Sequence, residues 1–216
     1  MNTYLGRIVI FLWVLSLSSC KSENDQNDRY IFFIHNRFLE THELHEVHPE
    51  FGRTEYQEII SEFKKSGFQV ISEKRNSNVN ANTYANKIVN QIDSLLANNI
   101  NPEKITIVGT SKGGYIAQYV STIANNPDLN FVFIASFRDR DIIEIPEINY
   151  CGNILNIYEK TDPFGVSAIA RQKESTCNII HFKEIELTTG MGHGFLFKPL
   201  KEWIEPTIQW ASGKYE

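Results

Sequence analysis

The chain has 216 residues, of which 42% are hydrophobic and 22% are charged, and its formal net charge is -5 at pH 7. This length and composition suit one globular domain that can bury a core without extra cross-links. The lysines and arginines are scattered rather than gathered into a basic stripe, so the sequence indicates no nucleic-acid partner.

The N-terminal segment is not expected to belong to the folded domain. Arg7 precedes an apolar run at residues 8–17, which is shorter than the ~20 residues that a membrane-spanning helix needs. The next residues, Leu17-Ser18-Ser19-Cys20, resemble the lipobox of bacterial lipoproteins. The resemblance implies a signal peptide at 1–19, lipidation of Cys20, and anchoring to a membrane of the bacterial cell envelope. An ordinary secretory signal is the alternative.

Residues 20–29 are polar and predict a flexible tether, and the folded domain is expected at 30–216. Continuous apolar runs, typical of strands buried on both faces, recur along this domain. Six strands are predicted, at Tyr30–Ile34, Phe68–Ser72, Ile105–Val108, Phe131–Ala135, Ile154–Tyr158 and His181–Leu187.

Amphipathic segments between these runs predict helices at Thr54–Lys65, at Ala81–Asn98 and over about 13 residues from Lys112. A last helix is expected at roughly Lys201–Ala211, where Pro206 should bend it or mark its true start. Alternating strands and helices indicate an α/β fold: a doubly wound, mostly parallel sheet of about six strands flanked by helices. Only 17 residues separate Ala135 from Asn153, which leaves no room for a lid domain.

The central chemical motif is Gly109-Thr110-Ser111-Lys112-Gly113, which lies between a predicted strand and a predicted helix. A nucleophile there must project from a sharp turn, and glycines two residues before and after Ser111 remove Cβ atoms that would clash. The following helix directs free N–H groups and its positive dipole end at the site. A glycine-rich turn that binds phosphate, or nothing, is the alternative interpretation.

Together with Gly192-His193-Gly194-Phe195, this motif resembles the α/β-hydrolase family over roughly residues 30–211, and small members without a lid most closely. Catalytic residues in that family follow the order serine, acid, histidine. The resemblance therefore implies Ser111 as nucleophile, Asp162 as acid just past the fifth strand, and His193 as base after the last strand. Glu159 is the alternative acid.

The resemblance also implies an oxyanion hole formed by the backbone N–H groups of Lys112 and Arg37. Most relatives have His-Gly in the loop after the first strand, whereas this chain has His35-Asn36. Because asparagine tolerates a positive φ better than most residues, the turn is expected to survive, with His35 bracing the loop.

The predicted function is that of a serine hydrolase that acts on an acyl ester or a related carbonyl compound through an acyl-enzyme intermediate. Its partner would be a small-molecule acyl substrate, and no metal or organic cofactor is required. Two other functions stay open: an inactive hydrolase-like binding protein, and an acyltransferase on the same scaffold. The oligomeric state also stays open.

Three further groups of residues have two interpretations each. The phenylalanines near the motifs either line the pocket or belong to the core, and the core is preferred for the last two: Phe38, Phe164, Phe195 and Phe197. His42, His45 and His48 are interpreted as part of a solvated loop rather than as metal ligands. Cys151 and Cys177 each precede a predicted strand and are expected as free buried thiols, with a disulfide as the alternative.

Overall fold

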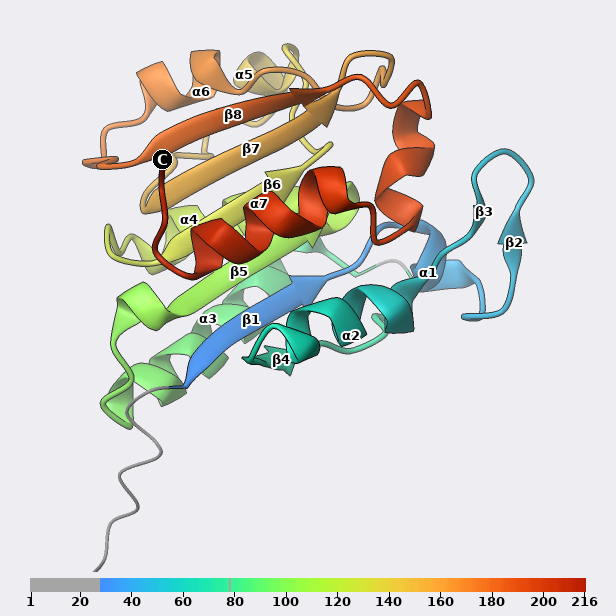
Figure 1. The fold of residues 1–216 in the computed structure, drawn as a ribbon. Helices are drawn as coiled ribbons and strands as arrows, with labels where there is room; N and C mark the ends of the chain where they lie inside the picture. The colour runs from blue at the N-terminus through green and yellow to red at the C-terminus, as the bar shows by residue number, and fades with distance from the viewer. Residues whose placement is uncertain (1–27, 78) are drawn as a thin grey trace, which may run out of the picture.

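The computed structural model describes residues 28–77 and 79–216, and its centre is a six-stranded parallel sheet (Figure 1). The strand order is β4-β1-β5-β6-β7-β8. The bounds are β1 (Arg29–Ile34), β4 (Phe68–Ile71), β5 (Ile105–Thr110), β6 (Asn130–Ile134), β7 (Asn153–Glu159) and β8 (Phe182–Leu187). All six predicted strands are therefore present, and the first begins at Arg29, inside the segment predicted as tether.

Helices cover both faces of the sheet, which confirms the doubly wound α/β prediction. On one face lie α2 (Tyr56–Lys65) and α7 (Lys201–Ala211), and on the other lie α3 (Ala81–Ala97) and α4 (Lys112–Ala124) (Figure 1). Shorter elements complete the order: α1 (Phe38–Thr41), β2 (Val47–His48), β3 (Gly52–Arg53), α5 (Asp141–Glu144), α6 (Ile169–Glu174), η2 (Pro102–Lys104) and η3 (Gly192–Phe197).

The strands divide their side chains between two cores because successive residues of a strand point to opposite faces. In β1, Ile31 and Phe33 join the core under α2 and α7, whereas Phe32 and Ile34 join the core under α3 and α4. This two-sided burial explains why the strands are continuous apolar runs in the sequence.

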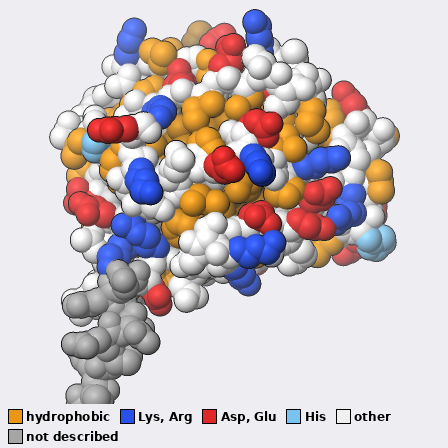
Figure 2. Space-filling model, viewed as in Figure 1, with side chains coloured by type: hydrophobic (Ala, Val, Ile, Leu, Met, Phe, Trp, Pro, Cys, Tyr) orange, Lys and Arg blue, Asp and Glu red, His pale blue; other side chains and the backbone are white. Residues whose placement is uncertain are grey.

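Helix α7 differs in one detail from its sequence prediction. Pro206 lies inside the helix, which begins at Lys201, so the interpretation of Pro206 as the true start is wrong. Proline removes only one intrahelical hydrogen bond, and the buried Trp203 and Trp210 on either side hold the helix against the sheet. Hydrophobic side chains remain visible across the middle of this face of the molecule (Figure 2).

A disulfide joins Cys151 to Cys177, whose Cα atoms are 5.2 Å apart. The expectation of two free buried thiols was therefore wrong. Each cysteine lies shortly before one of two neighbouring parallel strands, β7 and β8. Because parallel strands begin at the same edge of the sheet, the two cysteines come together there.

The predicted signal peptide and the lipidation site at Cys20 lie outside the described residues. Among the residues that the structure describes, no helix combines the length and the apolar character required to cross a membrane.

Candidate active site

Ser111 lies on a sharp turn between β5 and α4, with a backbone φ of 52° and ψ of -120°. Few residues other than glycine adopt a positive φ, so this turn depends on close packing around it. A Cβ on Gly113 would stand 1.9 Å from the Ile34 carbonyl oxygen, and one on Gly109 would stand 2.3 Å from the Gly113 carbonyl oxygen. The prediction that the flanking glycines avoid clashes is confirmed.

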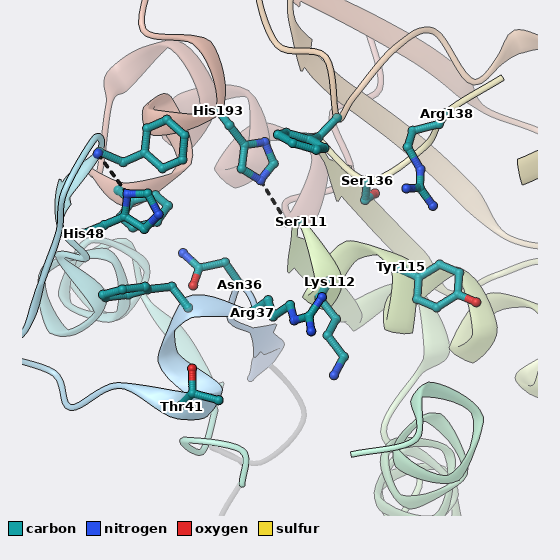
Figure 3. A pocket seen from close by; sticks show the side chains of 15 residues that line it. Asn36, Arg37, Thr41, His48, Ser111, Lys112, Tyr115, Ser136, Arg138 and His193 are labelled. Atoms are coloured by element: carbon teal, nitrogen blue, oxygen red, sulfur yellow. Dashed lines mark hydrogen bonds between the residues drawn. The ribbon is translucent and has the colours of Figure 1, made fainter. Parts of the chain in front are cut away.

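The hydroxyl of Ser111 meets the imidazole of His193, which lies in η3 (Figure 3). The distance from Ser111 Oγ to His193 Nε2 is 2.9 Å, and His193 Nδ1 lies 2.6 Å from Asp162 Oδ2. Only 11% of the His193 side chain and none of the Asp162 side chain is exposed. An ionised Asp162 can only accept, so Nδ1 carries the proton and Nε2 is free to accept from the serine hydroxyl.

The turn after β7 fixes the orientation of Asp162, because its other oxygen, Oδ1, accepts a hydrogen bond of 2.8 Å from the Phe164 N–H. Glu159, the alternative acid, does not contact His193. Its buried carboxylate accepts from the Thr189 N–H and hydroxyl and from the Gly190 N–H. Burial alone would raise the Glu159 pKa, but these hydrogen bonds outweigh it and hold the pKa below its usual value.

The two residues predicted to form an oxyanion hole lie at the same pocket as Ser111. Lys112 is the first residue of α4 and Arg37 directly precedes α1, so neither N–H takes part in a hydrogen bond within its helix. The short approach of Gly113 to the Ile34 carbonyl brings the start of α4 against the loop after β1. Asn36 does not adopt the positive φ that was expected for it; the loop turns without one.

An ion cluster holds this loop. Glu40, whose side chain is 2% exposed, pairs with Lys112 Nζ at 2.6 Å and with the buried Arg75 Nε at 3.1 Å. Arg75 also donates to the carbonyl oxygens of His35 and Asn36. One carboxylate thus connects the residue after Ser111 to the backbone of the loop after β1.

His35 braces the same loop, as the sequence predicted. Its Nδ1 donates to the Asn36 carbonyl at 2.7 Å, and its Nε2 accepts from the Arg75 N–H at 2.8 Å. Burial, with Arg75 as the next contribution, lowers the His35 pKa to about 3, so the ring is neutral near pH 7.

The cavity beside Ser111 has a volume of about 540 Å³, and Figure 3 shows the side chains that line it. Four phenylalanines line it: Phe38, Phe51, Phe164 and Phe197. Of the four phenylalanines weighed in the sequence, Phe195 is buried in the core as preferred, and Phe38 and the 52% exposed Phe164 line the cavity. Phe197, also preferred as core, is buried and lines the cavity as well.

The histidines after α1 are not simply a solvated loop, so that prediction was wrong for His48. His48 lines the cavity and stacks on Phe51 with ring centroids 4.5 Å apart, and it also packs edge-on against Phe38. His42 stacks on Phe38 with ring centroids 4.0 Å apart, while His45 is exposed. No cluster of three or more metal-binding side chains occurs within residues 28–77 and 79–216.

Sequence reasoning missed Glu40, Arg75 and the hairpin formed by β2 and β3. A signal existed for the first two, since each follows the carboxyl end of a predicted strand, where the ends of parallel strands share one edge. The two-residue strands of the hairpin offer no such pattern.

No family model and no curated protein matches this sequence. Solved structures do match its fold. An arylesterase is 15% identical, covers 88% of this chain and 78% of its own, and superposes with a TM-score of 0.60. A mutant of the esterase E40 is 12% identical over 87% of this chain and 76% of its own, with a TM-score of 0.57. Dienelactone hydrolase from Anabaena variabilis is 13% identical over 88% and 89%, with a TM-score of 0.54.

At these identities the likeness concerns the fold alone. The chain has the fold of the α/β-hydrolases, with no lid domain within residues 28–77 and 79–216, and the three proteins named above are hydrolases.

Proposed function

We propose that this protein is a serine hydrolase that cleaves an acyl ester or a related carbonyl compound. The observation that carries the proposal is the continuous chain of hydrogen bonds from the Ser111 hydroxyl through His193 to Asp162. The arrangement matches the roles of nucleophile, general base and orienting acid.

In the proposed reaction, Ser111 Oγ bonds to the substrate carbonyl carbon while its proton passes to His193 Nε2. The N–H groups of Lys112 and Arg37 bind the oxyanion that develops; removing one such donor typically raises the barrier by about 2.7–4 kcal/mol. The alcohol then leaves with the proton from His193. Water, deprotonated by His193, attacks the acyl-enzyme and releases the acid and free Ser111.

Labelling with a fluorophosphonate probe tests this proposal. We expect covalent labelling at Ser111, none in Ser111→Ala, and near-complete loss in His193→Ala and Asp162→Asn, with hydrolysis of a short-chain ester lost in parallel. A folded native protein that reacts neither with the probe nor with esters would favour an inactive binding protein instead. Labelling together with preferential transfer to an added alcohol or amine would favour an acyltransferase.

We further propose that the protein is a lipoprotein of the bacterial cell envelope, anchored through Cys20. The lipobox-like segment Leu17-Ser18-Ser19-Cys20 and the disulfide between Cys151 and Cys177 support export to an oxidising compartment. Cys20→Ala should move the protein from the membrane fraction to the soluble fraction; unchanged fractionation would contradict the anchor.

A further inference from the structure

The cavity beside Ser111 has two chemically different sides. On the side of His48, aromatic rings pack against one another, and one of them, Phe51, reaches His193 at a centroid distance of 6.1 Å. Away from His48, Figure 3 shows polar and cationic side chains around Ser111: Arg37, Lys112, Tyr115, Ser136 and Arg138. Within the described part of the chain, no aspartate or glutamate lines the cavity.

The charged side chains that surround the loop after β1 include more cations than carboxylates. Glu40 is shared by Arg75 and Lys112, so one negative charge faces two positive ones. Arg37 adds a third cation, and among the residues that the structure describes it has no acidic partner. Arg138 is different, because Asp141 pairs with its guanidinium at 2.8 Å.

The electrostatic environment of His35 agrees with this count around Glu40. After burial, the contributions that lower its pKa come from Arg75, Lys74 and Lys112, all of them cations.

The excess is local, because the whole chain carries a formal net charge of -5. The net negative charge of the protein repels anions in general. Cations confined to the pocket beside Ser111 therefore favour only those anionic substrates that fit the pocket. A guanidinium without a partner, such as that of Arg37, presents a planar set of donors that matches a carboxylate.

We propose, on the basis of the hydrolase function above, that the pocket selects esters that carry a carboxylate a few bonds from the scissile carbonyl. Arg37 binds the carboxylate through its side chain, and the aromatic side of the pocket holds the apolar remainder of the substrate. Arg37 thereby serves twice, with its N–H directed to the oxyanion and its guanidinium to the substrate anion.

Two pairs of matched esters test the proposal, one for each position of the anion. On the acyl side, 4-nitrophenyl hydrogen glutarate is compared with 4-nitrophenyl pentanoate, which has a methyl group in place of the carboxylate. On the alcohol side, 4-acetoxybenzoate is compared with 4-methylphenyl acetate. The quantity measured is the ratio of kcat/KM for the anionic ester to kcat/KM for the neutral ester. This ratio does not change when a substitution affects the hydrolysis of both esters equally.

In at least one pair, Arg37→Gln should lower this ratio by about tenfold, as expected for loss of a charge-assisted contact. The ratio of the native protein should also fall as ionic strength rises. Arg140→Gln is the matched control, since Arg140 is 61% exposed, carries the same charge and does not line the cavity. Its ratio should stay that of the native protein.

The possible failures are distinguishable. If Ser111 takes up the fluorophosphonate probe and neutral esters are hydrolysed, but Arg37→Gln leaves both ratios unchanged, selection of a carboxylate is wrong and the hydrolase function stands. If neither labelling nor hydrolysis occurs, the hydrolase function itself has failed.

Discussion

At the scale of single residues, the turn between β5 and α4 shows how packing imposes a conformation that Ser111 would not adopt on its own. The positive φ of Ser111 is held because α4 approaches the end of β1 so closely that only glycine fits at position 113. The close approach places the hydroxyl of Ser111 at the rim of the sheet, where His193 can reach it.

His35 should make the stability of the fold sensitive to mild acid. Its pKa is about 3 in the folded chain and near 6.5 when unfolded, so the unfolded chain binds more protons between these values. The free energy of unfolding therefore has its full value above about pH 6.5 and decreases as the pH falls, by about 1.4 kcal/mol per pH unit for this one group.

Urea unfolding between pH 6.5 and 4.5 measures this effect, in a range where most carboxylates are still ionised. His35→Gln should lower stability at pH 7, through loss of the buried ring, and flatten the decrease toward acid. His45→Gln, at an exposed position of the next loop, should keep the native pH profile. An equal slope in the native protein and in His35→Gln would contradict the assignment.

At the scale of elements, the end of β7 organises the loop that carries His193. Glu159, the last residue of the strand, accepts hydrogen bonds from Thr189 and Gly190, which come shortly before η3. The sequence analysis gave Glu159 as the alternative catalytic acid. Its contacts are instead with Thr189 and Gly190, so its carboxylate holds the loop before His193 in place.

Glu159→Gln should weaken that loop, because an amide offers one acceptor oxygen to several donors and turns its own N–H groups toward the rest. Leaving one or more buried donors unpaired should lower the free energy of unfolding by about 1–3 kcal/mol, and the rate of fluorophosphonate labelling of Ser111 should fall with it. Because the folded pKa of Glu159 is depressed, its contribution is present above the unfolded pKa and is lost as the pH falls through the folded value.

Urea unfolding at pH 7 and at pH 3.5 measures both parts of this effect. The difference in stability between the native protein and Glu159→Gln should be larger at pH 7 than at pH 3.5. Glu205→Gln, on the exposed side of α7, is the control and should match the native protein in stability and labelling. A difference that grows toward acid would contradict the depressed pKa.

How well each element could be predicted depended on how local its signal is. The strands of the sheet are buried on both faces and so stand out as apolar runs, and α4 began at the predicted Lys112 because the glycine motif marks its start. The hairpin of β2 and β3 has two residues per strand and is held by contacts of His48 and Phe51 with Phe197, far along the chain. No local pattern encodes such contacts.

At the scale of the whole molecule, the same distinction applies to the site. The order of Ser111, Asp162 and His193 was predicted from the resemblance to the α/β-hydrolases. The parallel sheet brings the strand ends that these residues follow to one rim, where their side chains are hydrogen-bonded. The pairing of Glu40 with Arg75 and Lys112 could not be predicted from the sequence. It depends on side-chain geometry between residues that are 35 and 72 positions apart in the chain.

The disulfide between Cys151 and Cys177 should be a major source of stability for the sheet edge, because it links the entries of β7 and β8 across a separation of 26 residues. Closing a loop of this length in the unfolded chain corresponds to about 3.5 kcal/mol in the chain-entropy treatment. Replacing both cysteines by alanine should lower the free energy of unfolding by about that amount.

A reducing agent should destabilise the native protein similarly while leaving the double variant unaffected, so the variant is its own control. If the reductant leaves the urea midpoint of the native protein unchanged, the bond is either absent in solution or makes no contribution to stability, and the edge strands are held by their hydrogen bonds and packing alone.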